Sequence, residues 1–131
     1  MAPTVKEPPQ EFDATVETLI VGAGACGLIA ALSAAEAGQE VLVIEADAVP
    51  SGSTALSAGL IPAAGTKIQQ AAGVKDSTAL FAADIQAKAH QENNQELVDL
   101  LAQNAAEVID WLTQTQGLAF SLVDDFDYPG H

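Results

Sequence analysis

The chain has 131 residues, of which 49% are hydrophobic, and this length and composition predict one small folded domain rather than a disordered segment. Its formal net charge of −14 comes from 18 acidic residues against four lysines, with no arginine. Because nothing supplies a basic surface, we expect neither nucleic acid nor an anionic membrane as a partner, although such acidity also suits a plainly soluble surface.

The single cysteine excludes an internal disulfide and fits a reducing compartment. The N-terminus lacks the basic start and apolar core of a secretory signal, and no apolar run approaches the length of a membrane span. We therefore expect a cytoplasmic protein, and we predict no metal site. Residues 1–16 hold three of the six prolines and predict an extended or disordered lead-in to a domain at residues 17–131.

The first informative stretch is a strand followed by a glycine turn and a helix. Residues 19–21 are the apolar run of a buried parallel strand, which ends at Gly22. Gly22 allows a tight exit from the strand, Gly24 lets the backbone approach a pyrophosphate, and Gly27 lets the helix pack closely on the sheet. The free amides at the start of that helix would then face the phosphates.

The helix is predicted to end at Gly38, and residues 41–44 predict a second buried strand closed by Glu45. An acid at this position accepts hydrogen bonds from the ribose hydroxyls of a dinucleotide that lacks a 2′-phosphate. The alternative is an ordinary βαβ unit with a glycine-rich turn, which explains neither Gly24 nor Glu45. We expect Cys26, within the turn, to be a small buried residue rather than a reactive thiol.

Residues 51–59 form a predicted loop of small and hydroxylated residues, which lets the backbone pass close to a ligand and offers amides and hydroxyls to it. The same composition would also suit a plain surface loop. Directly after a dinucleotide-binding βαβ unit, a contact with the cofactor is the better interpretation. Residues 60–66 are predicted to be irregular, apolar and buried near the cofactor.

Helices are predicted for much of the remaining chain. A short one spans residues 67–72, and a longer one starts at an Asp76 or Ser77 cap and runs to about Gln91, with an apolar side made by Leu80, Phe81 and Ile85. The next is predicted to begin with a capping box of Asn93 and Glu96 and to end at Gly117. Its apolar stripe is predicted to comprise Leu97, Leu101, Val108 and Leu112. The last segment, residues 118–131, is predicted to hold one short strand before an acidic turn.

These elements give two firm strands, which are too few for the open sheet of a dinucleotide-binding fold. The last residues, Tyr128-Pro-Gly-His131, have the composition of a turn that continues. We therefore expect an α/β fold with a Rossmann-like βαβ unit and following helices, as an incomplete domain completed by another chain.

The sequence resembles the flavoprotein subunits of fumarate reductases and succinate dehydrogenases, together with the related 3-ketosteroid dehydrogenases. The resemblance rests on the turn at residues 21–27, the strand at 41–45, the loop at 52–59 and the ending at 128–131. It implies FAD, with the ADP half held by the turn and Glu45. The implied cofactor-binding residues are Gly22, Gly24, Ala25, Cys26, Gly27, Glu45, Ser53, Thr54, Ala58 and Gly59.

The sequence departs from the family where the loop opens with Ser51-Gly52 in place of the Gly-Gly of many members. Members with covalent flavin use a histidine early in this loop. No histidine lies between Gly38 and His90, so noncovalent FAD is expected.

The resemblance implies hydride transfer between the flavin and a CH–CH or C=C unit next to a carbonyl or carboxylate. Because the chain has no arginine, it cannot carry the proton donor of the fumarate reductases. The catalytic groups are therefore unknown, and Tyr128 and His131 are the only candidates for contact with a small-molecule substrate; a structural role is the alternative for both. Dehydrogenation of a cyclic ketone or steroid and reduction of an enoate both stay open.

We expect a second polypeptide to supply most catalytic groups, which makes the protein a heteromer. Two other hypotheses stay open. In the first, the chain is a noncatalytic nucleotide-binding assembly subunit. In the second, it is a fragment of an NAD-dependent dehydrogenase. The loop at residues 51–59 argues against the second of these, because a nicotinamide fold has no need of it there.

Overall fold

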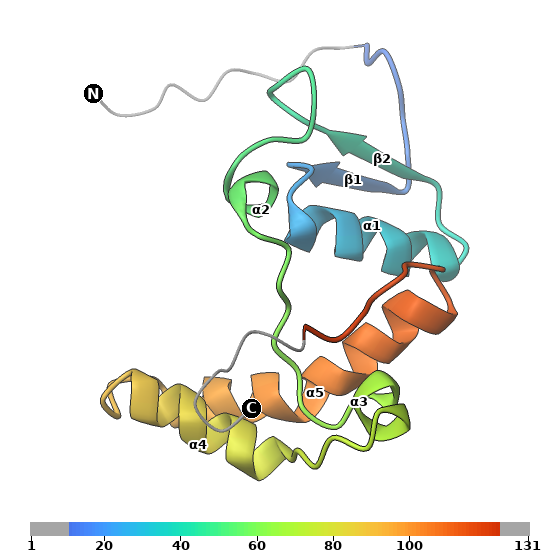
Figure 1. Cartoon of the computed structure of the whole chain (residues 1–131). Helices are drawn as coiled ribbons and strands as arrows, with labels where there is room; N and C mark the ends of the chain where they lie inside the picture. The colour runs from blue at the N-terminus through green and yellow to red at the C-terminus, as the bar shows by residue number, and fades with distance from the viewer. Residues whose placement is uncertain (1–10, 124–131) are drawn as a thin grey trace. The chain divides into compact units, whose positions relative to one another are not determined.

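The computed structural model describes residues 11–123 (Figure 1). These residues fall into two compact units, and the chain passes from the first to the second between Gly59 and Leu60. Within residues 11–123, none of the helices combines the length and the apolar content that a membrane span requires. Each unit is described by itself below.

The first unit is a βαβ arrangement followed by one helical turn (Figure 1). Strands β1 (Thr18–Val21) and β2 (Val41–Ile44) pair in parallel, with Thr18 opposite Val41 and Val21 opposite Ile44. Helix α1 (Ala25–Glu36) connects them, as a parallel pair requires, and packs on one face of the sheet. These bounds confirm the strand, helix and strand that the sequence predicts.

Gly27 sets how closely α1 approaches the sheet. A Cβ built on this residue would lie 2.0 Å from the carbonyl oxygen of Gly22 and 3.2 Å from Cγ2 of Ile20, so only glycine fits. At its other end α1 stops at Gly38, whose φ of +84° is a left-handed conformation that favours glycine. The Gly38 amide donates to the Ala35 carbonyl over 2.9 Å and closes the helix.

The opposite face of the sheet is apolar and exposed. Side chains alternate between the two faces along a strand. In β1, Thr18 and Ile20 therefore share one face, and Leu19 and Val21 share the other. On that second face, four large side chains are exposed: Leu19, Val21, Leu42 and Ile44. Val21 is 78% exposed. Parallel sheets usually carry cover on both faces, so this surface has the character of an interface rather than of an outer wall.

The second unit is helical, with α3 (Lys67–Ala71), α4 (Thr78–Lys88) and α5 (Gln95–Gln114). Its small core contains Ala64, Phe81 and Ala102, with α4 packed against α5. Side-chain caps start all three helices, because the first amides of a helix have no acceptor within it. The caps are Thr66 for α3, Ser77 for α4 and Asn94 for α5.

Two predicted boundaries in this unit are wrong. The cap of α5 is Asn94, whose side chain accepts from the Leu97 amide over 3.1 Å, and not Asn93. Helix α4 ends at Lys88 rather than near Gln91, since His90 and Gln91 have φ of 53° and 65° and cannot continue a right-handed helix.

The predicted apolar stripe of α5 lies on the helix but is mostly exposed. Leu112 is buried, whereas Leu97, Leu101 and Val108 are exposed. The buried face of α5 comprises Val98, Ala102, Ile109 and Leu112. The helix is apolar on two adjacent faces, and only one of them is buried.

The remaining differences concern irregular segments. The loop at residues 51–59 contains one helical turn, α2 (Ser53–Leu56), whose Leu56 amide donates to the Gly52 carbonyl over 3.1 Å. Leu60 and Ile61 are exposed rather than buried, as is Leu80 in α4. Residues 118–123 form neither helix nor strand, so the predicted strand is absent from that described part.

Candidate dinucleotide-binding site

The turn between β1 and α1 is held against β2 by backbone contacts. Gly22 leaves the strand with a φ of +103°, a conformation that side chains disfavour. Its amide nevertheless donates to the Ile44 carbonyl over 2.7 Å, which extends the pairing of the strands into the turn. The turn is therefore fixed relative to the end of β2.

Helix α1 begins with no side-chain cap on its Gly24 N-cap residue and with no acidic residue in its first turn. Its N-terminus has the partial positive charge of the helix dipole and amides that do not bond within the helix. The Ala25 amide donates to Oγ1 of Thr54 over 3.2 Å. Ala25 and Cys26 are exposed, which corrects the expectation of a buried cysteine. This end of the helix is suited to bind an anion.

The space beside Gly24 is not filled by the described residues. A Cβ built on Gly24 meets Oγ1 of Thr54 at 3.7 Å, which is an ordinary van der Waals contact. The chain itself therefore leaves room for a side chain at Gly24, unlike at Gly27. Close approach of a ligand to the backbone is the reason that remains for the absence of a side chain.

Glu45 lies at the end of β2 with both carboxylate oxygens bonded to backbone amides. Oε2 accepts from Ala23 over 2.8 Å, while Oε1 accepts from Ala46 over 2.6 Å and from Asp47 over 3.3 Å. The amide of Ala23 first, then those of Asp47 and Ala46, hold the pKa of Glu45 below its ordinary value of 4.5. The side chain is exposed and ionised near neutral pH, with lone pairs left for hydroxyl donors.

The loop after β2 approaches the turn through Thr54. Ser53 and Thr54 open α2, and the Thr54 hydroxyl reaches the first amide of α1. Ala58 and Gly59 follow α2 and are exposed. Ser57 orders this end of the loop, because its hydroxyl donates to the Thr54 carbonyl over 2.9 Å and accepts from the Gly59 amide over 3.2 Å.

All ten predicted cofactor-binding residues lie in the first unit, Met1–Gly59. Two further residues of the site were missed by sequence reasoning. Ala23 acts through its backbone amide, which no residue pattern reveals. Ser57 had a visible signal, a hydroxyl two residues before a glycine. The candidates for substrate contact, Tyr128 and His131, lie outside the described residues.

A helix N-terminus with no acid in its first turn and a carboxylate, joined to one glycine turn, can bind phosphate and ribose in the same molecule. The fold and site therefore define an α/β protein that binds a dinucleotide. Comparison with known families makes this specific. Residues 17–128 match the FAD binding domain, and the chain belongs to that family.

Similar proteins include reductases and dehydrogenases. The chain is 38% identical over 98 residues to a probable fumarate reductase of Shewanella frigidimarina, covering 75% of this chain and 17% of that protein. It is 31% identical over 127 residues to urocanate reductase of Eggerthella lenta, covering 97% of this chain and 21% of the relative.

Among solved structures, the chain resembles 3-ketosteroid-delta4-(5alpha)-dehydrogenase from Rhodococcus jostii RHA1 in complex with 4-androstene-3,17-dione. The TM-score is 0.70 at 30% identity, over 79% of this chain and 22% of that one. The chain thus spans about a fifth of the length of the relatives it matches.

Proposed function

We propose that this chain is the FAD-binding portion of a flavin-dependent oxidoreductase acting on a CH–CH or C=C unit next to a carbonyl or carboxylate. The family match establishes FAD as the cofactor, and the relatives are named for fumarate and urocanate reduction and for a ketosteroid dehydrogenase. The observation that carries the proposal is the shared attachment of the α1 N-terminus and Glu45 to one glycine turn.

In this proposal each part of the site binds a different part of FAD. The N-terminus of α1, with Ala25 and Cys26 in its first turn, faces the pyrophosphate, and the backbone of Gly24 allows its close approach. The Glu45 carboxylate accepts the ribose hydroxyls, and the Thr54 hydroxyl orients the first turn of α1. The bound flavin ring supplies the hydride chemistry, and this chain positions it.

Noncovalent attachment is part of the proposal. It is supported by the absence of histidine from the sequence between Gly38 and His90, since that stretch contains the loop after β2. A cytoplasmic location is also proposed, on the ground of the single cysteine, which suits a reducing compartment.

The third part of the proposal is a second polypeptide, which completes a Rossmann-like sheet and supplies the substrate site. It is supported by the exposed apolar face of the sheet, with Leu19, Val21, Leu42 and Ile44, because a parallel sheet of two strands needs cover and further pairing. The relatives have about four fifths of their length outside the matched region, which is ample to provide both.

Purification of the intact assembly tests the proposal. We expect a flavin absorbance spectrum, release of FAD on acid precipitation with no flavin left on the polypeptide, and a second polypeptide from the same family. Oxidation of reduced viologen with fumarate, urocanate or another enoate would indicate a reductase. Turnover of 4-androstene-3,17-dione or a cyclic ketone with an artificial electron acceptor would indicate a dehydrogenase.

Other outcomes would refute the proposal in distinguishable ways. Copurification of NAD instead of FAD would make the chain part of a nicotinamide enzyme. A bound nucleotide with no flavin bands and no turnover in either direction would make it a noncatalytic assembly subunit.

A further inference from the structure

The exposed side of α5 has a regular apolar stripe that the second unit does not use. We define the outer α5 stripe as Leu97, Leu101, Asn104 and Val108, which follow one another at intervals of four, three and four residues. Residues with this spacing lie on one face of a helix. Leu97 is 65% exposed, Leu101 53% and Val108 41%. Three large apolar side chains on one exposed helix face cost free energy unless another surface covers them.

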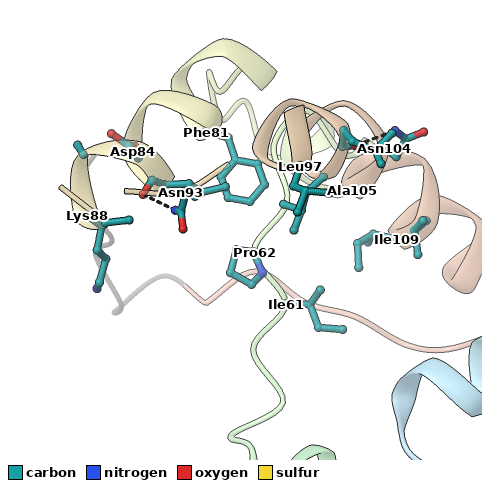
Figure 2. A pocket seen from close by; sticks show the side chains of 16 residues that line it. Ile61, Pro62, Phe81, Asp84, Lys88, Asn93, Leu97, Asn104, Ala105 and Ile109 are labelled. Atoms are coloured by element: carbon teal, nitrogen blue, oxygen red, sulfur yellow. Dashed lines mark hydrogen bonds between the residues drawn. The ribbon is translucent and has the colours of Figure 1, made fainter. Parts of the chain in front are cut away.

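This stripe forms one wall of a groove. The other walls come from α4 and from residues Ile61 and Pro62 (Figure 2). The groove has a volume of about 1510 Å³. Phe81 and Ile109 also line the groove, and both are buried. A largely apolar groove along two helices is the form that accepts an amphipathic helix.

The pattern within the stripe fits a helix better than a small molecule. Intervals of four and three residues are those at which one helix meets another through interlocking side chains. Asn104 is the single polar member, and its Nδ2 donates to the Leu100 carbonyl over 2.7 Å. A lone asparagine in an otherwise apolar helix seam fixes the register of the partner helix.

The charge beside the stripe selects the partner further. Leu100 borders the stripe on its outer side, and Glu96 and Glu107 lie next to it, both exposed. On the α4 wall the groove is lined by one charged residue of each sign, Asp84 and Lys88, so the excess of acid lies on the outer side of the stripe. The whole chain has a net charge of −14 and no arginine. A partner helix with lysine or arginine along its matching edge would therefore gain electrostatic attraction, and an acidic one would be repelled.

We propose that the groove between α4 and α5 receives an amphipathic α-helix with an apolar seam and a basic flank. The part of the flavoprotein outside the matched region supplies this helix, and in that respect the inference rests on the proposed assembly. The stripe is then an interface with the remaining polypeptide, which explains why a pattern typical of core residues lies on the surface of this chain.

Synthetic helical peptides test the chemistry directly. Three labelled peptides of about 21 residues, or three heptads, are titrated with the full chain and followed by fluorescence anisotropy. One has a leucine seam and a lysine flank, the second has a glutamate flank, and the third has the seam residues scrambled. We expect the lysine-flanked peptide to bind about tenfold more tightly than the glutamate-flanked one. The difference should shrink at high salt, and the scrambled peptide should not bind.

Variants of the chain locate the binding. Leu101→Asp and Leu97→Asp should each lower the affinity for the lysine-flanked peptide by about tenfold or more. Val74→Asp is the matched control, since Val74 is exposed in the same unit but does not line the groove, and it should leave binding unchanged. Circular dichroism verifies that each variant is folded. The comparison of peptides needs no variant, so it stands even if a substitution unfolds the chain.

Three results would overturn the inference. These are equal binding of all three peptides, equal weakening by Val74→Asp, and a dimer of the chain that Leu101→Asp dissociates, which would assign the face to a second copy. The FAD content of the assembly is measured separately. If the chain binds the lysine-flanked peptide but the assembly contains no FAD, the proposed function is refuted and the groove's specificity stands. If the assembly contains FAD but the chain does not bind the peptide, the groove proposal is refuted and the proposed function stands.

Discussion

The Glu45 carboxylate accepts a hydrogen bond of 2.8 Å from the backbone amide of Ala23, across 22 positions of sequence. This bond links the end of β2 to the turn that follows β1. The acid that is proposed to bind ribose and the turn that is proposed to bind pyrophosphate are therefore positioned as one unit. A change at either residue should alter both parts of the site.

Replacement of Glu45 by glutamine should remove a pH-dependent part of the stability. The backbone amides lower the pKa of Glu45 in the folded protein. A lowered pKa stabilises the folded state above the ordinary value of 4.5 and ceases to do so as the pH falls through the lowered value. Urea unfolding of wild type and Glu45→Gln from about pH 3 to 7 should give a stability difference that favours wild type near neutrality and shrinks in acid.

Glu107→Gln is the control for this comparison, because it removes an exposed acid on α5 that is remote in sequence from the turn. A stability difference between wild type and Glu45→Gln that stays constant over the whole pH range would contradict the assigned role of the Ala23 amide.

Two glycines of the turn should respond differently to alanine. Gly27→Ala places a Cβ 2.0 Å from the Gly22 carbonyl oxygen, so we expect a loss of stability of about 3 kcal/mol. Gly24→Ala meets only an ordinary contact of 3.7 Å with Oγ1 of Thr54, so the fold should persist. Its affinity for FAD should nevertheless fall by about a hundredfold, since the methyl group occupies the phosphate's place.

Thermal unfolding and FAD titration of both variants separate these effects. If Gly24→Ala bound FAD as tightly as wild type while remaining folded, the phosphate would not lie against Gly24. If Gly27→Ala melted like wild type, the close packing of α1 on the sheet would be wrong.

Thr54 should contribute through its hydroxyl rather than through its size. Thr54→Val keeps the shape but removes the acceptor for the Ala25 amide, and should cost about 1 kcal/mol of stability. Thr54→Ser keeps the acceptor and should lose less. Affinity for FAD, measured by fluorescence quenching, should follow the same order. Ser53→Ala is the neighbouring control, and a loss equal to that of Thr54→Val would show that the effect belongs to α2 as a whole.

The βαβ unit could be predicted because its determinants are local. β2 covers residues 41–44 as predicted, and Gly22, Gly27 and Gly38 lie where the backbone needs glycine. Glu45 could be assigned for the same reason, since it closes an unambiguous apolar run. The contact between Thr54 and Ala25 could not be predicted, because it joins residues 29 positions apart through a helical turn that the sequence presents as a loop.

The helical unit was harder to predict, because the buried face and the cap of α5 depend on tertiary packing. α5 is apolar on two neighbouring faces, and periodicity alone cannot show that Val98 and Ile109 are buried while Leu97 and Val108 are exposed. Adjacent asparagines likewise offer two equivalent caps. The path of the chain out of α4 decides that Asn94, not Asn93, meets the Leu97 amide.

The turn between α4 and α5 contains a residue in a strained backbone conformation. Gln91 has a φ of 65°, a left-handed conformation that costs a non-glycine residue about 1 kcal/mol. Gln91→Gly should remove this strain and raise the free energy of unfolding by up to about 1 kcal/mol, less the entropy that glycine gains when unfolded. Glu92→Gly, at the next position and outside the left-handed region, should only destabilise. Urea unfolding of the two variants distinguishes them, and a lower stability of both would mean that the Gln91 conformation is not strained.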